Sequence, residues 1–153
     1  MDALTETWSI HNRIHLYLVD EISDEGLSTA LNPKSRSVWG LFAHIHNVRL
    51  MWLKASAPDL MEGLEKLDTK SVGARASLQS ALVQSGKAIE DLLGRAAADG
   101  GRVKGFKPHS AGFLGYLISH ESHHRGQIEW ALRFAGQPLS DKVGYGMWEW
   151  GVR

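Results

Sequence analysis

Apolar residues recur every three to four positions in four stretches of the chain, and this periodicity constrains the fold more than any other feature. Such spacing places the apolar side chains of each stretch on one face of an α-helix. The predicted helices run approximately over Ala3–Ile22, Ser35–Lys54, Ser71–Asp99 and Ser110–Phe134. Strict alternation of apolar and polar residues, the mark of a half-buried strand, is absent from the sequence. The 153 residues therefore predict an all-α, four-helix bundle that forms a single domain over 1–153.

Composition excludes several classes of function. Lys plus Arg and Asp plus Glu each number 17, so no net charge draws the chain to nucleic acid or to an anionic membrane. There is no cysteine, which excludes disulfides, thiolate nucleophiles and Cys-ligated metals. Residues 1–6 are too polar for a signal peptide, and no apolar run is long enough to span a bilayer. We therefore expect a cytoplasmic protein that acts on neither nucleic acid nor membranes.

Histidines on the last predicted helix indicate a metal site. His120 and His124 stand four residues apart on the apolar side of that helix, so one metal ion can contact both imidazoles. His44, on the margin of the apolar face of the second helix, is a candidate third ligand, but His11 and His15 form another inward-facing pair with this spacing. From the residues alone these three compete for the third place. Three protein ligands leave an open coordination position, as catalytic sites require.

The sequence assigns other positions and roles to the residues beside these histidines. His46 and His123 are predicted to point away from the apolar faces of their helices. Glu121 is either a solvated surface acid or a carboxylate that orients a metal-binding histidine. A di-iron site would need two Glu-x-x-His motifs, and Glu121-x-x-His124 is the single match, so this alternative has little support.

Aromatic residues outside the main apolar faces suggest a second buried surface. Trp39 and Trp130 lie off the central stripes of their helices, which favours a homodimer. The tail 143–150 holds two tryptophans and a tyrosine, and clustered aromatics seldom remain in solvent. We expect this tail to pack back on the bundle, with closure of the site or a dimer contact as alternatives.

The string His120-x-x-x-His124-Arg125-Gly126-Gln127, with Leu41-x-x-His44-Ile45 on the second helix, resembles the DinB-like (damage-inducible) family. The resemblance covers most of the chain. It implies an up-down-down-up four-helix bundle, usually a homodimer, and selects His44, His120 and His124 as the metal ligands. It gives no metal role to His46 or His123. Family members with an assigned activity are metal-dependent transferases of small thiols, or isomerases that use one.

The other residues of the motif have physical interpretations. Gly126 in mid-helix is expected to allow the close approach of a neighbouring helix. Arg125 is expected to pair with an acid or a dimer partner, and Gln127 to hydrogen-bond a ligand imidazole or a substrate.

Two functions follow from these features. In the first, a divalent metal ion activates a water or a small-molecule thiol in a transferase or hydrolase reaction. Zinc is the first candidate, and nickel, iron and manganese are the alternatives. His11, His15 or Glu121 would then transfer protons. Because the chain has no cysteine, any thiol must belong to the substrate. In the second, the bundle binds a small ligand or a partner without catalysis, and the metal is incidental.

Overall fold

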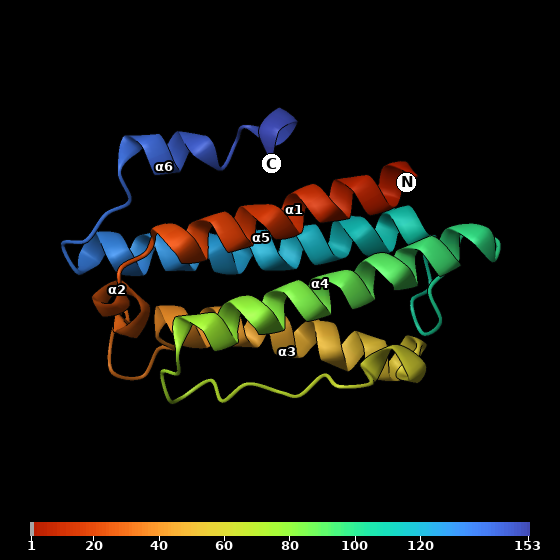
Figure 1. The fold of residues 1–153 in the computed structure, drawn as a ribbon, viewed down its shortest axis with the longest axis horizontal. Helices are drawn as coiled ribbons and strands as arrows, with labels where there is room; N and C mark the ends of the chain where they lie inside the picture. The colour runs from red at the N-terminus through yellow and green to blue at the C-terminus, as the bar shows by residue number, and fades with distance from the viewer. Residues whose placement is uncertain (1) are drawn as a thin grey trace.

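The computed structural model describes residues 2–153, and within them the chain is all-α with no strand. Four long helices lie side by side (Figure 1). They are α1 (Ala3–Glu21), α3 (Val38–Ser56), α4 (Arg75–Ala98) and α5 (Ser110–Phe134). Short helices α2 (Asp24–Ser28) and α6 (Asp141–Gly146) and 3-10 turns η1 (Pro58–Met61) and η2 (Trp150–Val152) complete the fold. The prediction of an all-α chain with four main helices is confirmed.

Capping residues set where the helices begin. Asp2 accepts hydrogen bonds from the backbone N–H groups of Leu4 and Thr5 at the start of α1. Ser37 caps α3, so this helix starts at Val38 and not at the predicted Ser35. The ring of His109 accepts from the Gly112 N–H and begins α5 as predicted.

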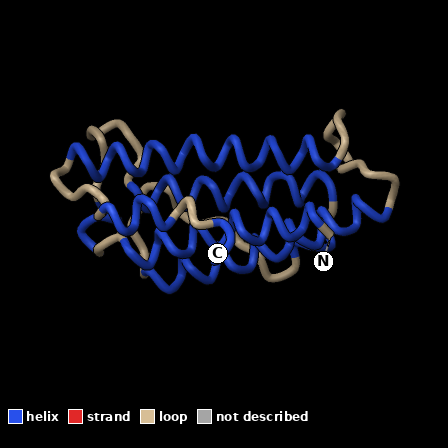
Figure 2. The backbone as a smooth tube through the Cα atoms, turned by 90° about the horizontal axis from the view of Figure 1, so that it is seen from above, coloured by secondary structure: helices blue, strands red, loops and turns tan. Residues whose placement is uncertain are grey.

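A long connection, residues 57–74, brings the chain back along α3 before α4 begins (Figure 1). Most other loops gather at the two ends of the bundle, as the view from above shows (Figure 2). The connection also covers part of α3. The indole N–H of Trp39 donates to the Asp68 carbonyl at 3.1 Å, and this side chain is only 2% exposed. The burial of Trp39 therefore needs no second subunit, contrary to our interpretation of the sequence.

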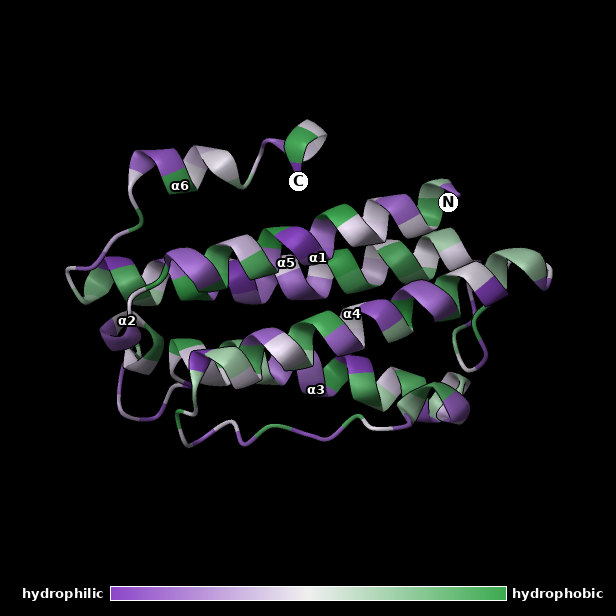
Figure 3. Ribbon diagram, viewed as in Figure 1, coloured by the Kyte–Doolittle hydropathy of each residue, from purple (hydrophilic) through white to green (hydrophobic). Residues whose placement is uncertain are grey.

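Each long helix carries both hydrophobic and hydrophilic residues (Figure 3), and the buried apolar residues form two separate clusters. One includes Leu18, Phe42 and Ile128. The other includes Trp8 and Phe113. Along α1, α3 and α5 the residues between these clusters are polar and buried: His11, His15, Arg49 and Glu121. A polar layer thus divides the core of the bundle.

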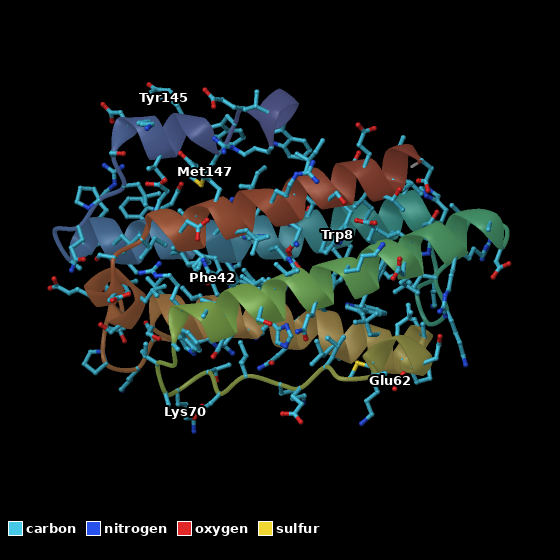
Figure 4. The ribbon with its side chains drawn as sticks, in the orientation of Figure 1. Trp8, Phe42, Glu62, Lys70, Tyr145 and Met147 are labelled. Carbon is cyan, nitrogen blue, oxygen red and sulfur yellow. The ribbon has the colours of Figure 1, made fainter. Side chains whose placement is uncertain are left out.

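The C-terminal tail packs back on the bundle as predicted, but not through its largest aromatics. Val143 and Met147 are buried in the core cluster that contains Leu18, whereas Tyr145 and Trp148 are 74% and 76% exposed. Figure 4 shows Met147 directed toward the bundle and Tyr145 directed away from it. The expectation that the tail aromatics would be covered is therefore wrong for these two residues.

No helix among residues 2–153 combines the length and the apolar character needed to cross a membrane.

Candidate metal centre

The three histidines of the sequence motifs meet on one side of the bundle. His44 comes from the first half of α3, and His120 and His124 come from successive turns of α5. The centroid of the His44 ring lies 5.4 Å from the centroid of the His120 ring and 4.6 Å from that of the His124 ring. The Nε2 atoms of His120 and His124 are 3.1 Å apart, and one ligand atom from each ring lies within 4.8 Å of the others. We call these residues the three-histidine cluster.

Gln127 fixes the orientation of one ring in this cluster. Its Oε1 lies 2.7 Å from His124 Nδ1 and accepts a hydrogen bond from it. With the proton on Nδ1, the lone pair of Nε2 faces His120 and His44. The predicted hydrogen bond from a candidate ligand to Gln127 is confirmed, and it is of the kind that orients metal-bound imidazoles.

The three imidazoles are neutral at physiological pH. Burial, followed by the positive charge of Arg36, lowers the pKa of His44 to about 4. Burial also lowers the pKa of His120, and His124 adds to this effect. The pKa of His124 is lowered by burial although the hydrogen bond to Gln127 opposes the shift. Neutral imidazole is the form that binds metals, so these rings are ready to ligate without losing a proton.

A second polar cluster lies deeper in the bundle, and Glu121 is at its centre. The Nε2 atoms of His11 and His15 donate to Glu121 Oε2 at 2.9 and 3.0 Å. Arg49 forms a bidentate pair with the same carboxylate, at 2.7 Å from Nε to Oε1 and 2.8 Å from Nη2 to Oε2. These four residues, which we call the glutamate cluster, are at most 1% exposed. Glu121 is therefore not a solvated surface acid.

Charge pairing sets the protonation states in the glutamate cluster. Burial alone would raise the pKa of the Glu121 carboxyl, but the charge and hydrogen bonds of Arg49 hold it well below 4.5. Burial lowers the pKa of His15 to about 3 and also lowers that of His11, although hydrogen bonds to Glu121 oppose both shifts. The cluster thus holds one anion, one cation and two neutral imidazoles. His11, His15 and Glu121 are close enough together that they could hold a metal ion.

The model of the DinB family matches residues 1–141. The chain belongs to the DinB family. No curated protein and no solved structure matches it. The resemblance seen in the sequence is therefore confirmed over most of the 153 residues.

His46 and His123 of this DinB-family chain lie outside both clusters, as the sequence predicted. His46 Nε2 donates to the Glu65 carbonyl at 2.8 Å, under the connection between α3 and α4. His123 is exposed on α5. The single Glu-x-x-His match is also divided, because Glu121 belongs to one cluster and His124 to the other. A di-iron carboxylate site is not assembled from this motif.

Gly126 and Arg125 of the DinB motif lack their expected partners within the described chain. A Cβ atom on Gly126 would meet nothing within 4 Å, so no helix of the described chain packs closely there. Arg125 donates to Ser122 Oγ at 3.2 Å and joins no ion pair within residues 2–153. The expectation for Gly126 is wrong within the single chain, and a dimer partner for Arg125 stays a prediction.

Arg49 is the residue of the glutamate cluster that our interpretation of the sequence missed. It stands four residues after Ile45 and four before Leu53, so it shares the inward face of α3 with two buried apolar residues. Glu121 stands on the apolar arc of α5 in the same way. A cation and an anion on inward faces of two helices are the signal that predicts a buried pair, because neither charge is stable alone in a core.

Proposed function

We propose that this DinB-family protein binds one divalent metal ion through His44, His120 and His124, with zinc the first candidate and nickel, iron or manganese as alternatives, and uses it to act on a small molecule. The observation that carries the proposal is the convergence of three neutral imidazoles from two helices, with ligand atoms within 4.8 Å of one another. No fourth ligand joins them among the described residues, so a substrate position would remain open.

The glutamate cluster is the competing metal site, and its chemistry favours another role. Arg49 donates to Glu121 Oε2, the same oxygen that a metal would use, so a guanidinium charge would lie beside the ion. Both histidine Nε2 atoms carry protons that would have to move to Nδ1, where no acceptor is present among the described residues. We assign the glutamate cluster a structural role and the metal to the three-histidine cluster.

The chemistry proposed for the centre follows from its open position. A divalent ion there would supply Lewis acidity that lowers the pKa of a bound water or thiol. Gln127 would hold the His124 ring in the tautomer that keeps Nε2 free for ligation. Because the chain contains no cysteine, a thiol would come from the substrate, which makes a thiol transferase or a hydrolase the reaction class that we propose.

The up-down-down-up topology and the homodimer belong to the same proposal. The connection 57–74 supports the topology, because it lets α3 and α4 run in the same direction (Figure 1). Phe134, the last residue of α5, supports the dimer because its apolar side chain is 70% exposed. A cytoplasmic location also remains a prediction.

Metal analysis of the purified full-length chain tests the assignment. After chelation and reloading with zinc, we expect about one ion per chain in the wild type and a loss of most of it in His124→Ala, because two imidazoles bind weakly. His123→Ala, next to it on the exposed side of α5, is the matched control, and His11→Gln reports on the glutamate cluster. Undiminished zinc in His124→Ala, or its loss in His11→Gln alone, would overturn the assignment. Consumption of a small thiol by zinc-loaded wild type, compared with thermal stabilisation alone, separates catalysis from simple binding.

A further inference from the structure

A cavity with a volume of about 940 Å³ opens beside the three-histidine cluster. Its walls come from the loop that leads into α3, from the end of the connection before α4, and from α5. Gln127 lines it and also binds His124, and Leu41 lines it one helical turn before His44. Gln127 therefore connects the cavity to the candidate metal centre.

The charge of this cavity has one sign. Lys34, Arg36 and Lys70 line it, and no acidic side chain is among its described lining residues. None of the three takes part in an ion pair within residues 2–153. Lys70 lies close to Asp68, which accepts a hydrogen bond from the Lys70 backbone N–H, so Lys34 and Arg36 are the less compensated cations.

Arg36 is the cation best placed to hold a ligand near the histidines. It lines the cavity together with Gln127, whose side chain hydrogen-bonds the His124 ring. It directly precedes Ser37, the cap of the 19-residue helix α3, so the positive end of that helix adds to the same potential. A guanidinium binds a carboxylate through two parallel hydrogen bonds, which fixes the direction of the ligand as well as its charge.

Part of the cavity lining is apolar and aromatic. Leu31 and Trp130 line it, and their side chains are 51% and 56% exposed. Large apolar side chains left open beside a cationic site form a surface for a ligand with an apolar body and an anionic group.

We propose that this cavity binds a small organic carboxylate, with the anionic group on Arg36 and the apolar part against Leu31 and Trp130, so that the ligand extends toward the three-histidine cluster. The orientation toward a metal rests on the proposed function. Binding of the carboxylate does not, because its contacts lie outside the three histidines, and this allows the two proposals to fail separately.

Phenylacetate and its neutral analogue phenylacetamide are the probes for this site. Ligand-observed NMR titrations of the full-length chain, both zinc-loaded and chelator-treated, give the two affinities. We expect phenylacetate to bind roughly tenfold more tightly than the amide in both forms, the difference of one charge-assisted contact. Equal affinity for the two probes, or no binding of phenylacetate, would overturn the proposal.

Arg36→Gln should abolish the preference for phenylacetate without changing the affinity for phenylacetamide, and Arg36→Lys should retain part of it because the charge remains. Arg102→Gln, in the loop at the other end of the bundle (Figure 1), is the matched loss of one positive charge and should leave the preference intact. If Arg102→Gln lost the preference for phenylacetate to the same extent, the preference would depend only on net charge, and the site at Arg36 would be refuted. If the wild-type chain showed this preference but did not bind zinc, the carboxylate site would be supported and the proposed metal centre would be refuted.

Discussion

The glutamate cluster and the three-histidine cluster meet at adjacent residues of α5, Glu121 and His120, yet they use histidine in different ways. In the glutamate cluster both imidazoles donate to a carboxylate that a guanidinium already neutralises. In the three-histidine cluster no charged side chain pairs with the rings, and His44 and His120 are only partly buried. The charged groups of the glutamate cluster are paired with each other within the described chain, whereas the three-histidine cluster has imidazole nitrogens that could bind a metal.

Removing the central charge of the glutamate cluster gives the largest expected effect. Glu121→Gln leaves Arg49 buried without an anion, so we expect the free energy of unfolding to fall by about 3–5 kcal/mol. Denaturant unfolding monitored by tryptophan fluorescence measures the change. Glu62→Gln, on the exposed connection, is the control and should change stability by less than about 0.5 kcal/mol. A loss in Glu121→Gln no larger than in the control would remove the distinction between the clusters.

In the three-histidine cluster, removing the hydrogen bond that orients the His124 ring should lower the affinity for the metal. Gln127→Leu takes away the acceptor of the His124 Nδ1–H, so we expect zinc affinity to fall by roughly 10- to 100-fold. Competition with a chromophoric chelator gives the affinity, and Gln84→Leu on the exposed side of α4 is the control. Unchanged affinity would mean that the hydrogen bond does not set the ring for ligation.

Acid should weaken the fold through the buried histidines. The pKa of His15 is about 3 in the folded chain, against an ordinary value of 6.5, so the unfolded chain binds the extra proton between these values. Stability therefore rises with pH across this window and is lost on acidification. Between pH 7.5 and 5.5 we expect His15 alone to account for about 1.4 kcal/mol of the loss. Denaturant unfolding of wild type and His15→Gln at both pH values measures this share, and a variant that loses as much stability as wild type would contradict it.

The smallest effect concerns the helix that the two clusters share. Because a Cβ on Gly126 meets nothing within 4 Å, Gly126→Ala should stabilise α5 by roughly 0.5–1 kcal/mol. Gly86→Ala is the contrasting variant, because its Cβ would collide with the Asn12 side chain and lower stability. Thermal unfolding distinguishes the two. A destabilised Gly126→Ala would reveal a surface packed against that position from outside the chain.

Helical periodicity was sufficient to predict the main elements and the inward position of His120 and His124, because the face of a helix follows from spacing alone. Spacing alone does not show which residues of another helix this face contacts. The pairing of Arg49 with Glu121 depends on how α3 and α5 are rotated and shifted against each other, and spacing within one helix carries no such information. The DinB resemblance, and not periodicity, selected His44 above His11 and His15, and the structure brings His44 to the α5 pair.

The sequence also did not predict which side chains are buried beneath loops and the C-terminal tail. Trp39 and His46 lie off the main stripe of α3 but are buried because the connection 57–74 lies over them. Tyr145 and Trp148 are apolar yet stay in solvent, since α6 contacts the bundle through Val143 and Met147 instead. Hydrophobicity predicts a tendency to be buried, and the path of a loop decides whether a cover exists.

The polar layer that divides the core has a consequence for how the helices align. If α3 slid by one turn along α5 toward the start of α5, Arg49 would face Leu117 in place of Glu121, and Glu121 would face hydrocarbon. Both charges would then be buried without a counterion, at a cost of several kcal/mol. The purely apolar clusters on either side tolerate such a shift far better, because one leucine replaces another. The ion pair between Arg49 and Glu121 thereby fixes the axial register of α3 against α5. This register also sets the position of His44 relative to His120 and His124 before any ligand binds.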